Sequence, residues 1–418
     1  MVTAARAFDV LAEAVGNAGV RDAGAEDAVA GVMPALVVSP RDEEQVGAVL
    51  RAAAGQGLTV VVRGGGTKLG WGAPPRRCDV VLSTARLDAL VEHEPGDLVC
   101  VVGAGMRLSA LQDLLAAHGQ RLALDPPQGV DATIGGIVAA NAWGPLRSHF
   151  GTVRDLVLGA RFVAGDGTVG HSGGKVVKNV AGYDVAKLLI GSLGTLAVIT
   201  QVALRLHPLP RAARTVAYQN LSGAQAAAVW RAVQGAAATP VAVVALSPGG
   251  AMLVRVEGSE SGAAAQADAL LSATAGAAPL VRVLGEAEAD KAWGYASTCV
   301  WGGDPVDPVA NLAVPRSELA ALLDRLGELP HTAVVLPSVG VAEVRLPLGT
   351  GAAAVVALRE WAERRGGHLV LRRPSPDLAA ITWPAAAEGD AAVDLMRSLK
   401  RSLDPYGSLA AGRFLAGI

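Results

Sequence analysis

The sequence predicts a protein of the α+β class that contains more than one domain, and three observations support this prediction. The chain has 418 residues, a length that favours two or three domains over one. Residues 34–210 alternate helical and strand-like segments with glycine-rich loops. Residues 211–374 alternate helices with strands in the order typical of an antiparallel sheet, and glycine loops are sparser there.

Composition excludes several classes of function. The chain carries 36 Lys and Arg residues against 38 Asp and Glu residues, so nothing favours nucleic acid or an anionic membrane as a partner. Cys78, Cys100 and Cys299 are scattered without CxxC spacing, which argues against a disulfide framework and against a cysteine metal site. The N-terminus lacks the basic and apolar regions of an export signal. We therefore expect a cytoplasmic protein without a membrane span.

The longest uncharged run, residues 232–254, is long enough for a membrane helix but is interrupted twice. Pro240 and the Ser-Pro-Gly-Gly cluster at 247–250 break it. We expect a helix end followed by a hairpin, with strands at 239–247 and 251–258.

The remaining elements follow from hydrophobic periodicity and turn residues. In the first region the segment 39–57 is expected to be a helix that Ser39 caps, and it leads into a strand over 58–66. Asp166-Gly167 marks a hairpin within 156–169. Further helices are expected at 106–119, 222–237, 315–329 and 351–366, and 391–414 is expected to be a helix that ends in a Pro- and Gly-punctuated tail. Further strands are expected at 79–87, 98–105, 194–206, 331–338, 342–348 and 368–373. The predicted segments are 1–33 (N-terminal helical segment), 34–210, 211–374 and 375–418 (C-terminal segment).

A first glycine-rich segment follows the strand at 58–66. It contains Gly64, Gly65 and Gly66 between Arg63 and Thr67-Lys68. Glycines can adopt positive φ and let backbone N–H groups approach phosphate oxygens, so the loop is a candidate dinucleotide cradle. It is neither a Walker loop nor a Rossmann fingerprint, and taken alone it is equally compatible with a tight turn.

A second segment, residues 124–162, contains Thr133-Ile134-Gly135-Gly136 and Asn141, followed by Gly151 and Arg154-Asp155. Small residues over this length would let a flat ring system lie against the main chain, and Thr and Asn could bond its polar edge. The alternative is that these glycines serve turns and that Arg154 and Asp155 form a surface pair.

A third segment places Gly182-Tyr183-Asp184 before an amphipathic run and Gly191 to Thr195 before a β-rich run. Backbone groups at Val198 or Ile199 could pair with an adenine edge. A buried strand with a turn explains the same pattern.

All three segments occur in order, and residues 34–210 thereby closely resemble the FAD-binding domain of the p-cresol methylhydroxylase (PCMH) and vanillyl-alcohol oxidase (VAO) superfamily, in its glycolate oxidase and D-lactate dehydrogenase branch. The resemblance implies a PCMH/VAO-type FAD-binding domain of two subdomains (34–210), an α+β cap domain with an antiparallel sheet (211–374), and a C-terminal segment whose DPxG turn at 404–407 returns the chain to the FAD domain.

The resemblance also assigns residues to FAD. It places the pyrophosphate at the first loop, the ribityl chain and flavin at the second segment, and the adenine at the third. The cofactor-binding candidates are Arg63, Gly64, Gly65, Gly66, Thr67, Lys68, Pro126, Thr133, Ile134, Gly135, Gly136, Asn141, Gly151, Asp155, Val198 and Ile199.

Two departures from the family pattern refine these expectations. Thr67 stands where members with covalent flavin have His, so we expect non-covalent FAD. The metal-binding GHxGDGN motif of catalytic cap domains is not found, and His331 and His368 each stand alone, so no metal site and no catalytic side chain is assigned.

Together these features resemble the FAD-binding subunits of glycolate oxidase-type complexes. Such a subunit would take part in oxidising a short 2-hydroxy acid beside a larger FAD-containing catalytic subunit and an iron–sulfur subunit. Two alternatives stay open: a non-catalytic assembly subunit containing FAD, and a stand-alone FAD-dependent oxidoreductase acting on another alcohol.

Overall fold

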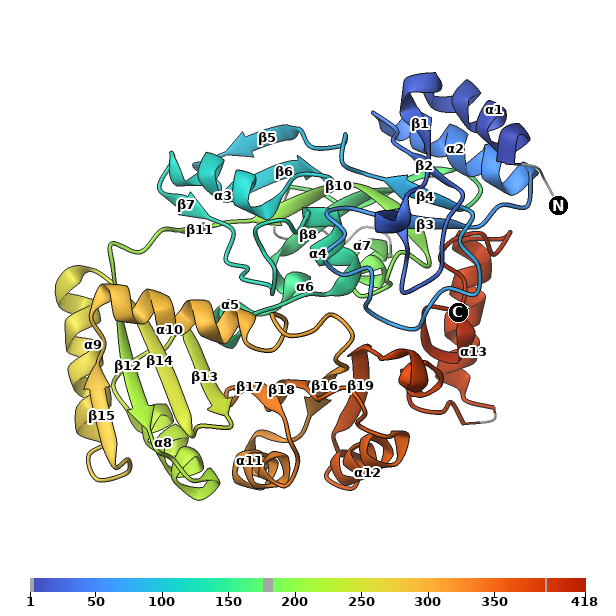
Figure 1. Ribbon diagram of the computed structural model, residues 1–418. Coiled ribbons are helices and arrows are strands. Elements are labelled where there is room, and N and C mark those ends of the chain that lie inside the picture. Colours follow the sequence, from blue (N-terminus) through green and yellow to red (C-terminus); the bar gives the residue numbers. More distant parts are fainter. Residues whose placement is uncertain (1–3, 176–182, 388) are drawn as a thin grey trace.

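The computed structural model describes residues 4–175, 183–387 and 389–418, so Gly182 of the third glycine-rich segment lies outside the described residues. Figure 1 shows two halves: the upper half contains the N-terminal part of the chain and its C-terminal end, and the lower half contains the segment between them. The predicted combination of helices and antiparallel sheets is confirmed. No helix among the described residues is long and apolar enough to cross a membrane.

The first sheet lies in the upper half and has the strand order β1-β2-β4-β3. Strands β2, β3 and β4 are parallel, and β1 is antiparallel to β2. Val46 and Leu50 are buried with Val60 and Leu82 in the core between this sheet and its helices. The elements are α1 (Ala4–Val15), β1 (Val20–Asp22), β2 (Leu36–Val38), α2 (Glu43–Gly55), β3 (Val60–Arg63) and β4 (Val80–Ser83).

Two local predictions in this region were wrong. Asp42, not Ser39, caps helix α2. Asp42 immediately precedes the helix, and its carboxylate accepts a hydrogen bond at 2.8 Å from Gln45 N, one of the amides that have no partner within the helix. The segment 1–33 is not helical throughout, since its residues after α1 include strand β1, which pairs with β2.

The second sheet, also in the upper half, is antiparallel and has the order β5-β6-β10-β8-β9. The hairpin predicted at Asp166-Gly167 is confirmed between β8 and β9, where Gly167 has a φ of 82°. The strands are β5 (Leu90–Glu94), β6 (Val99–Gly103), β8 (Val157–Ala164), β9 (Val169–Gly173) and β10 (Ala197–Arg205), beside a separate pair of β7 (Gln120–Arg121) and β11 (His207–Pro208). The helices are α3 (Leu108–Ala116), α4 (Ile134–Ala140), α5 (Arg147–Phe150), α6 (Val153–Leu156) and α7 (Val185–Leu189).

The third sheet forms the lower half and is antiparallel, in the order β15-β12-β14-β13-β17-β18-β16-β19. The expected hairpin at 239–258 is confirmed as β13 and β14. The strands are β12 (Ala212–Gln219), β13 (Ala242–Ser247), β14 (Ala251–Gly258), β15 (Leu280–Val283), β16 (Val309–Ala313), β17 (Thr332–Leu336), β18 (Val341–Arg345) and β19 (His368–Arg373). The helices are α8 (Gly223–Gly235), α9 (Glu260–Ala273), α10 (Glu286–Thr298), α11 (Leu319–Gly327) and α12 (Ala352–Glu363).

The two faces of this third sheet have different partners. Helices α8, α11 and α12 lie on the face turned away from the upper half, whereas α10 lies on the face turned toward it (Figure 1). Val334 and Leu336 on the upper face share a core with residues of the upper half such as Trp143. The two halves are therefore packed against each other through an apolar core. The division into domains remains a prediction.

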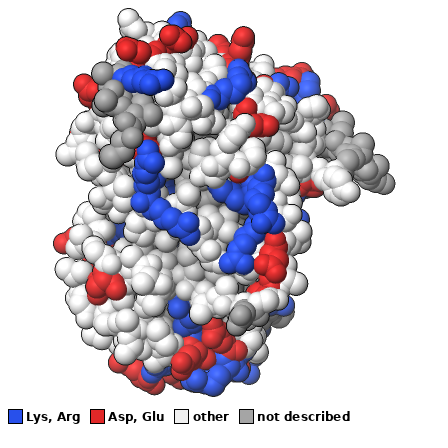
Figure 2. Space-filling model, turned by 90° about the vertical axis from the view of Figure 1, so that its right-hand side faces the viewer, with Lys and Arg blue, Asp and Glu red and all other residues white. Residues whose placement is uncertain are grey.

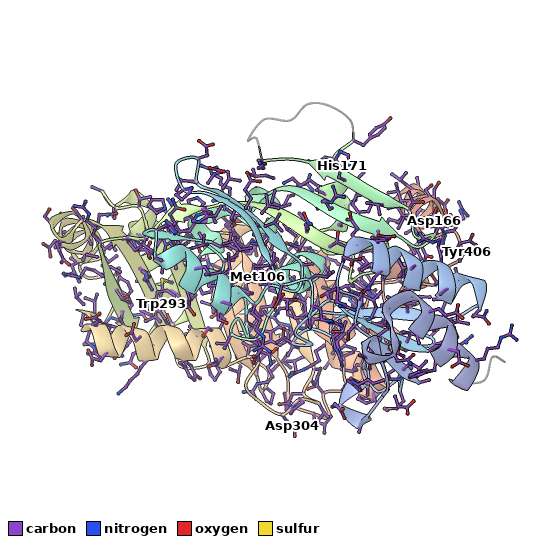
Figure 3. The ribbon with its side chains drawn as sticks, turned by 90° about the horizontal axis from the view of Figure 1, so that it is seen from above. Met106, Asp166, His171, Trp293, Asp304 and Tyr406 are labelled. Atoms are coloured by element: carbon purple, nitrogen blue, oxygen red, sulfur yellow. The ribbon has the colours of Figure 1, made fainter. Side chains whose placement is uncertain are left out.

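The C-terminal segment returns to the upper half through helix α13 (Ala391–Leu403). Lys400 donates to Thr195 O at 2.6 Å, and Val60 N donates to Ser408 O at 2.8 Å. Asp166 and Tyr406 accordingly lie side by side at one end of the molecule in Figure 3. Short 3₁₀ helices complete the described chain: Asn17–Gly19, Ala25–Asp27, Arg316–Glu318, Pro376–Ile381 and Leu415–Gly417.

Candidate functional site

The first glycine-rich loop leaves strand β3 and packs directly on the start of the second segment. A Cβ atom at Gly64 would overlap Thr133 Oγ1, and one at Gly65 would overlap the carbonyl oxygen of Asp131. Gly66 has a φ of 78°, which disfavours other residues. Both the close approach and the backbone conformation therefore require glycine here.

The second segment forms helix α4, which the sequence pattern did not predict as a helix. Thr133 caps it, with its hydroxyl accepting from Gly136 N at 3.4 Å, and Gly135 packs on Ala104 at the end of β6. Asn141 ends the helix in the left-handed conformation, with a φ of 46°. Small residues in this helix thus allow backbone to lie close to backbone.

The third segment attaches to the C-terminal end of the same helix. Leu193 N donates to Ala139 O at 2.8 Å, and Gly191 N donates to Val138 O at 3.0 Å. The chain then enters β10, where Ile199 faces the helix and Val198 faces the opposite side, because side chains alternate along a strand.

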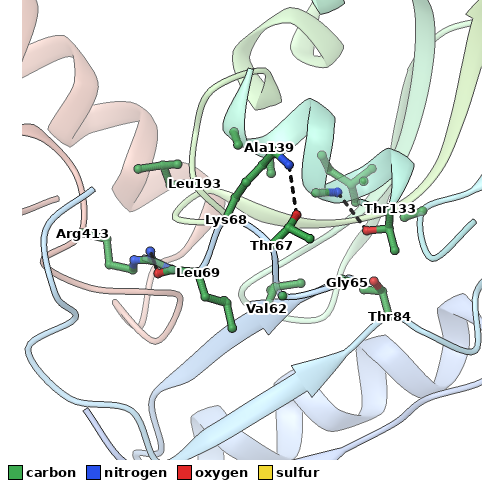
Figure 4. A pocket seen from close by; sticks show the side chains of 18 of the residues that line it. Val62, Gly65, Thr67, Lys68, Leu69, Thr84, Thr133, Ala139, Leu193 and Arg413 are labelled. Atoms are coloured by element: carbon green, nitrogen blue, oxygen red, sulfur yellow. Dashed lines mark hydrogen bonds between the residues drawn. The ribbon is translucent and has the colours of Figure 1, made fainter. Parts of the chain in front are cut away.

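These segments line one open pocket, drawn in Figure 4. Its walls are mostly small or apolar, and its cationic side chains are Lys68 and Arg413. The lining residues are Val62, Gly64, Gly65, Gly66, Thr67, Lys68, Leu69, Thr84, Ala104, Thr133, Gly135, Gly136, Ala139, Ala140, Leu193, Gly194, Ala197, Ile199 and Arg413.

Lys68 is the more perturbed of the two cations. Its ammonium group donates to Thr67 Oγ1 at 3.0 Å and to Pro127 O at 3.1 Å, and lies 5.8 Å from the ring centroid of Trp71. Burial, together with the nearby charge of Arg372, lowers the pKa of Lys68 to about 8. No carboxylate is paired with this ammonium group within the described part of the chain. An anionic ligand in the pocket would therefore stabilise the charged form of Lys68.

Arg413 enters the pocket from the C-terminal segment. Its guanidinium donates to Leu69 O and to Trp71 O, each at 2.5 Å, and so holds the chain that follows the glycine loop. Burial lowers the pKa of Arg413 to about 10. The closing motif at 402–414 is noticeable in the sequence, but nothing in it indicates that Arg413 reaches a loop more than 300 positions away.

Nine of the predicted residues line the pocket together: Gly64, Gly65, Gly66, Thr67, Lys68, Thr133, Gly135, Gly136 and Ile199. The others lie outside its lining. Arg63 pairs with buried Asp27 at 2.5 Å and lines a shallower recess on the other side of the loop. Ile134 and Val198 point into the hydrophobic cores, and Pro126 is buried nearby.

Gly151, Asp155 and Asn141 likewise do not line the pocket. Asp155 accepts from Thr152 N at 2.7 Å and caps the short helix α6, and Gly151 adopts a φ of 82° beside it. This is a local turn. Lining residues that the sequence reasoning missed are chiefly apolar: Val62, Leu69, Thr84, Ala104, Ala139, Ala140, Leu193, Gly194, Ala197 and Arg413.

The two histidines considered from the sequence do not come together. His331 Nε2 lies 2.7 Å from Ser247 Oγ and its Nδ1 lies 2.8 Å from Leu329 O, whereas His368 is exposed at the start of β19. Over 4–175, 183–387 and 389–418, no group of three or more His, Cys, Asp or Glu side chains is placed to hold a metal ion.

Comparison with known proteins indicates the cofactor of this chain. Residues 34–173 match the sequence profile of the family described as "FAD binding domain". This part of the chain is similar to FAD-binding domains. It contributes the glycine loop and helix α4, which approach each other closely because the loop glycines have no Cβ atom. The small residues fit a flat cofactor, and Lys68, which has no carboxylate partner among the described residues, fits its anionic pyrophosphate.

Curated relatives match the same region. A D-lactate dehydrogenase of Archaeoglobus fulgidus is 42% identical over 177 residues, which cover 42% of this chain and 39% of that protein. Glycolate oxidase subunit GlcE of Escherichia coli is 43% identical over 124 residues, 29% of this chain and 35% of that protein. Glycolate oxidase subunit GlcD of Bacillus subtilis is 30% identical over 194 residues, 46% and 41%. The chain thus spans less than half the length of these relatives.

Solved structures extend the likeness of fold to nearly the whole chain. A p-cresol methylhydroxylase with substrate bound superimposes with a TM-score of 0.76 at 14% identity, covering 98% of this chain and 96% of that one. A 4-ethylphenol oxidase from Gulosibacter chungangensis gives 0.75 at 17% identity, with the same coverage. The predicted PCMH/VAO-type fold is therefore confirmed, and FAD is the cofactor that the comparisons indicate.

Proposed function

We propose that this chain is the FAD-binding subunit of a glycolate oxidase-type complex that oxidises a short 2-hydroxy acid. The observation that carries the proposal is the convergence of all three glycine-rich segments on a single pocket. The names of the relatives, D-lactate dehydrogenase and glycolate oxidase subunit, supply the substrate class. Bound FAD would supply the capacity to accept a hydride from the carbon that bears the hydroxyl group.

The residues of this chain would hold the cofactor without a covalent bond. The amides of the loop Gly64–Thr67 and the ammonium group of Lys68 would bind the pyrophosphate. Helix α4 and Leu193 would flank the ribityl chain and the ring, and Ile199 would lie toward the adenine. Thr67 has no ring nitrogen able to bond to the flavin.

The same proposal includes two further subunits, a larger FAD-containing subunit and an iron–sulfur subunit. Cys78 and Cys100 are buried and free, and Cys299 is also free. Burial raises the pKa of Cys78 to about 11 and of Cys100 to about 12, so neither is predisposed to bind iron as a thiolate. Electrons would leave through a partner's cluster. Reduced thiols also accord with a cytoplasmic location.

A second candidate function is that of an assembly subunit whose FAD is structural, with turnover confined to the larger subunit. The hydrogen bonds that hold His331 to Ser247 and to Leu329 O favour it, because they give this cap histidine a structural position. A stand-alone oxidoreductase acting on another alcohol is the remaining alternative.

The test is an anaerobic stopped-flow experiment on the FAD-loaded chain, followed at the flavin absorption band. We expect slow bleaching by glycolate or D-lactate with the chain alone and faster bleaching after the larger flavoprotein subunit is added. Rapid bleaching by the chain alone would favour a stand-alone enzyme. A pull-down that recovers neither a second flavoprotein nor a cysteine-rich chain would contradict the complex.

A further inference from the structure

A separate recess opens in the lower half of the molecule. Residues of helices α8 and α11 and of the hairpin formed by β13 and β14 line it (elements labelled in Figure 1). It holds about 480 Å³, which is enough for a small organic molecule. None of its lining residues also lines the FAD pocket. A ligand of this recess would therefore be distinct from FAD.

Ser247 and His331 are hydrogen-bonded to each other in the wall of this recess. Ser247 ends β13, and His331 immediately precedes β17, the strand that pairs with it. Ser247 Oγ lies 2.7 Å from His331 Nε2, and His331 Nδ1 lies 2.8 Å from Leu329 O. A carbonyl oxygen can only accept, so Nδ1 carries the hydrogen and, in the neutral ring, Nε2 accepts from the serine hydroxyl. In this arrangement an imidazole can act as a base toward a serine.

The turn that follows Ser247 supplies two backbone donors. Gly249 and Gly250 have φ values of 116° and 59° and line the same recess. A Cβ atom at Gly250 would overlap Leu221 O, so the turn requires glycine there. Within the described part of the chain, neither glycine amide donates a hydrogen bond. Free amides beside a nucleophile can stabilise the oxyanion that forms when it attacks a carbonyl group.

The remaining walls of the recess are mostly apolar. Leu246, Leu323 and Leu329 contribute to them, and none of the described lining residues is Lys, Arg, Asp or Glu. By contrast, Lys and Arg side chains gather near the waist between the two halves on the face shown in Figure 2, where anions would be attracted. The uncharged recess instead favours a neutral ligand with a short apolar group, because a charged group would lose its hydration without gaining a counterion.

We propose that this recess binds small neutral carboxylic esters and that Ser247 attacks their carbonyl carbon, with His331 as the general base. As Ser247 Oγ bonds to that carbon, its proton passes to His331 Nε2, and the amides of Gly249 and Gly250 bind the oxyanion. The bond between the carbonyl carbon and the alcohol oxygen then breaks, and Nε2 returns the proton to the alcohol. Water, activated by the same nitrogen, hydrolyses the acyl-serine and releases the acid.

The third member of the arrangement limits the rate of this reaction. Leu329 O is a neutral carbonyl, which orients the ring of His331 but compensates little of the positive charge that the ring acquires. We therefore expect slow turnover and a preference for esters with a good leaving group. No step involves FAD, so the inference does not depend on the proposed function.

The experiment uses the FAD-loaded full chain and p-nitrophenyl butyrate, with release of p-nitrophenolate and the mass of the chain as readouts. Peptide mass mapping locates the butyryl group. The succinate half ester, which has the same number of acyl carbons and carries a carboxylate, tests the preference for a neutral substrate.

Two variants, Ser247→Ala and His331→Gln, remove the nucleophile and the base in turn. Their matched controls are Ser398→Ala, at an exposed serine of α13, and His171→Gln, at an exposed histidine of β9 (Figure 3). Flavin content and melting temperature verify that each variant is folded.

We expect the butyryl group on Ser247 of the wild type. The acylation rate should fall by roughly 100-fold or more in His331→Gln, as for loss of a positioned general base. Ser247→Ala should abolish the release of p-nitrophenolate above the level of free imidazole, and both control variants should react like the wild type. The half ester should react more slowly than the butyrate.

Three results would count against the inference. Acylation of other side chains with Ser247 unmodified would overturn it. Equal acylation of Ser247 in the wild type and in folded His331→Gln protein would also overturn it, because the histidine would then serve only to hold the serine. Faster reaction of the half ester would contradict the assignment of a neutral substrate.

Discussion

Replacement of Lys68 by Met tests the electrostatics of the FAD pocket. Burial lowers the pKa of Lys68 from an ordinary value of 10.5 to about 8. At about 1.4 kcal/mol per pH unit, this difference corresponds to roughly 3 kcal/mol of unfavourable free energy for the charged form in the cofactor-free protein. Loss of the hydrogen bonds to Thr67 and Pro127 offsets about 1 kcal/mol of this. The variant should therefore stabilise the apoprotein at pH 7 by about 2 kcal/mol.

The sign of the pH dependence follows from proton counting. Between pH 8 and 10.5 the unfolded chain keeps the proton on Lys68 and the folded apoprotein loses it, so stability rises with pH in this window. The advantage of Lys68→Met should therefore be complete below pH 8 and fall to less than half by about pH 9.5. Urea unfolding of both apoproteins at pH 7 and pH 9.5 measures it, with exposed Lys291→Met as the control.

The effect on FAD binding should have the opposite sign. The pyrophosphate would provide the counterion that Lys68 lacks, so Lys68→Met should raise the dissociation constant for FAD by roughly 10- to 100-fold at pH 7. In the wild type the dissociation constant should rise above pH 8, and in the variant this rise should be absent. Equal FAD affinity in the two proteins, or an apoprotein destabilised by Lys68→Met at pH 7, would refute the reasoning.

Three other predictions concern the glycine loop, the attachment of FAD and Glu343. Gly65→Asp should yield protein with little flavin, because its Cβ overlaps Asp131 O; normal flavin occupancy would mean that the loop is misassigned. Acid precipitation should release intact FAD into the supernatant, since Thr67 cannot form a flavin bond; yellow pellets would contradict this. Glu343→Gln should raise the melting temperature at pH 8 and leave it unchanged near pH 4.5. Burial raises the pKa of Glu343 to about 7, so its tendency to ionise destabilises the folded state only above pH 4.5. A gain independent of pH would show that the charge of Glu343 is not the cause.

Several of the predicted residues that line the pocket share one property: their identity follows from the local backbone. Gly64, Gly65 and Gly66 are required by close approach and positive φ, and such requirements are visible as glycine in a one-dimensional sequence. Thr133 is similar, because a cap hydroxyl before a run of small residues has a local cause. The resemblance of the three segments, taken in order, then indicated FAD.

The predicted residues that do not line the pocket differ from their neighbours in side-chain direction rather than in location. Val198 and Ile199 are adjacent, yet only Ile199 lines the pocket, since the pleat turns successive side chains to opposite faces. Ile134 and Asn141 belong to the correct helix but point away or end it. A pattern of small residues locates the segment without stating which side of it faces the ligand.

By itself the sequence determined the α+β class, the FAD-binding loops and the absence of a histidine after the glycine triplet, because each depends on residues that are neighbours in the chain. Only the tertiary structure decided that Arg413 holds the chain after Gly66, and that Arg372, which donates to Ala140 O of the pocket wall, pairs with Glu343. These side chains come from segments up to hundreds of residues apart. Their charges interact through space, and burial by both halves of the molecule sets their pKa values, so no local pattern encodes the arrangement.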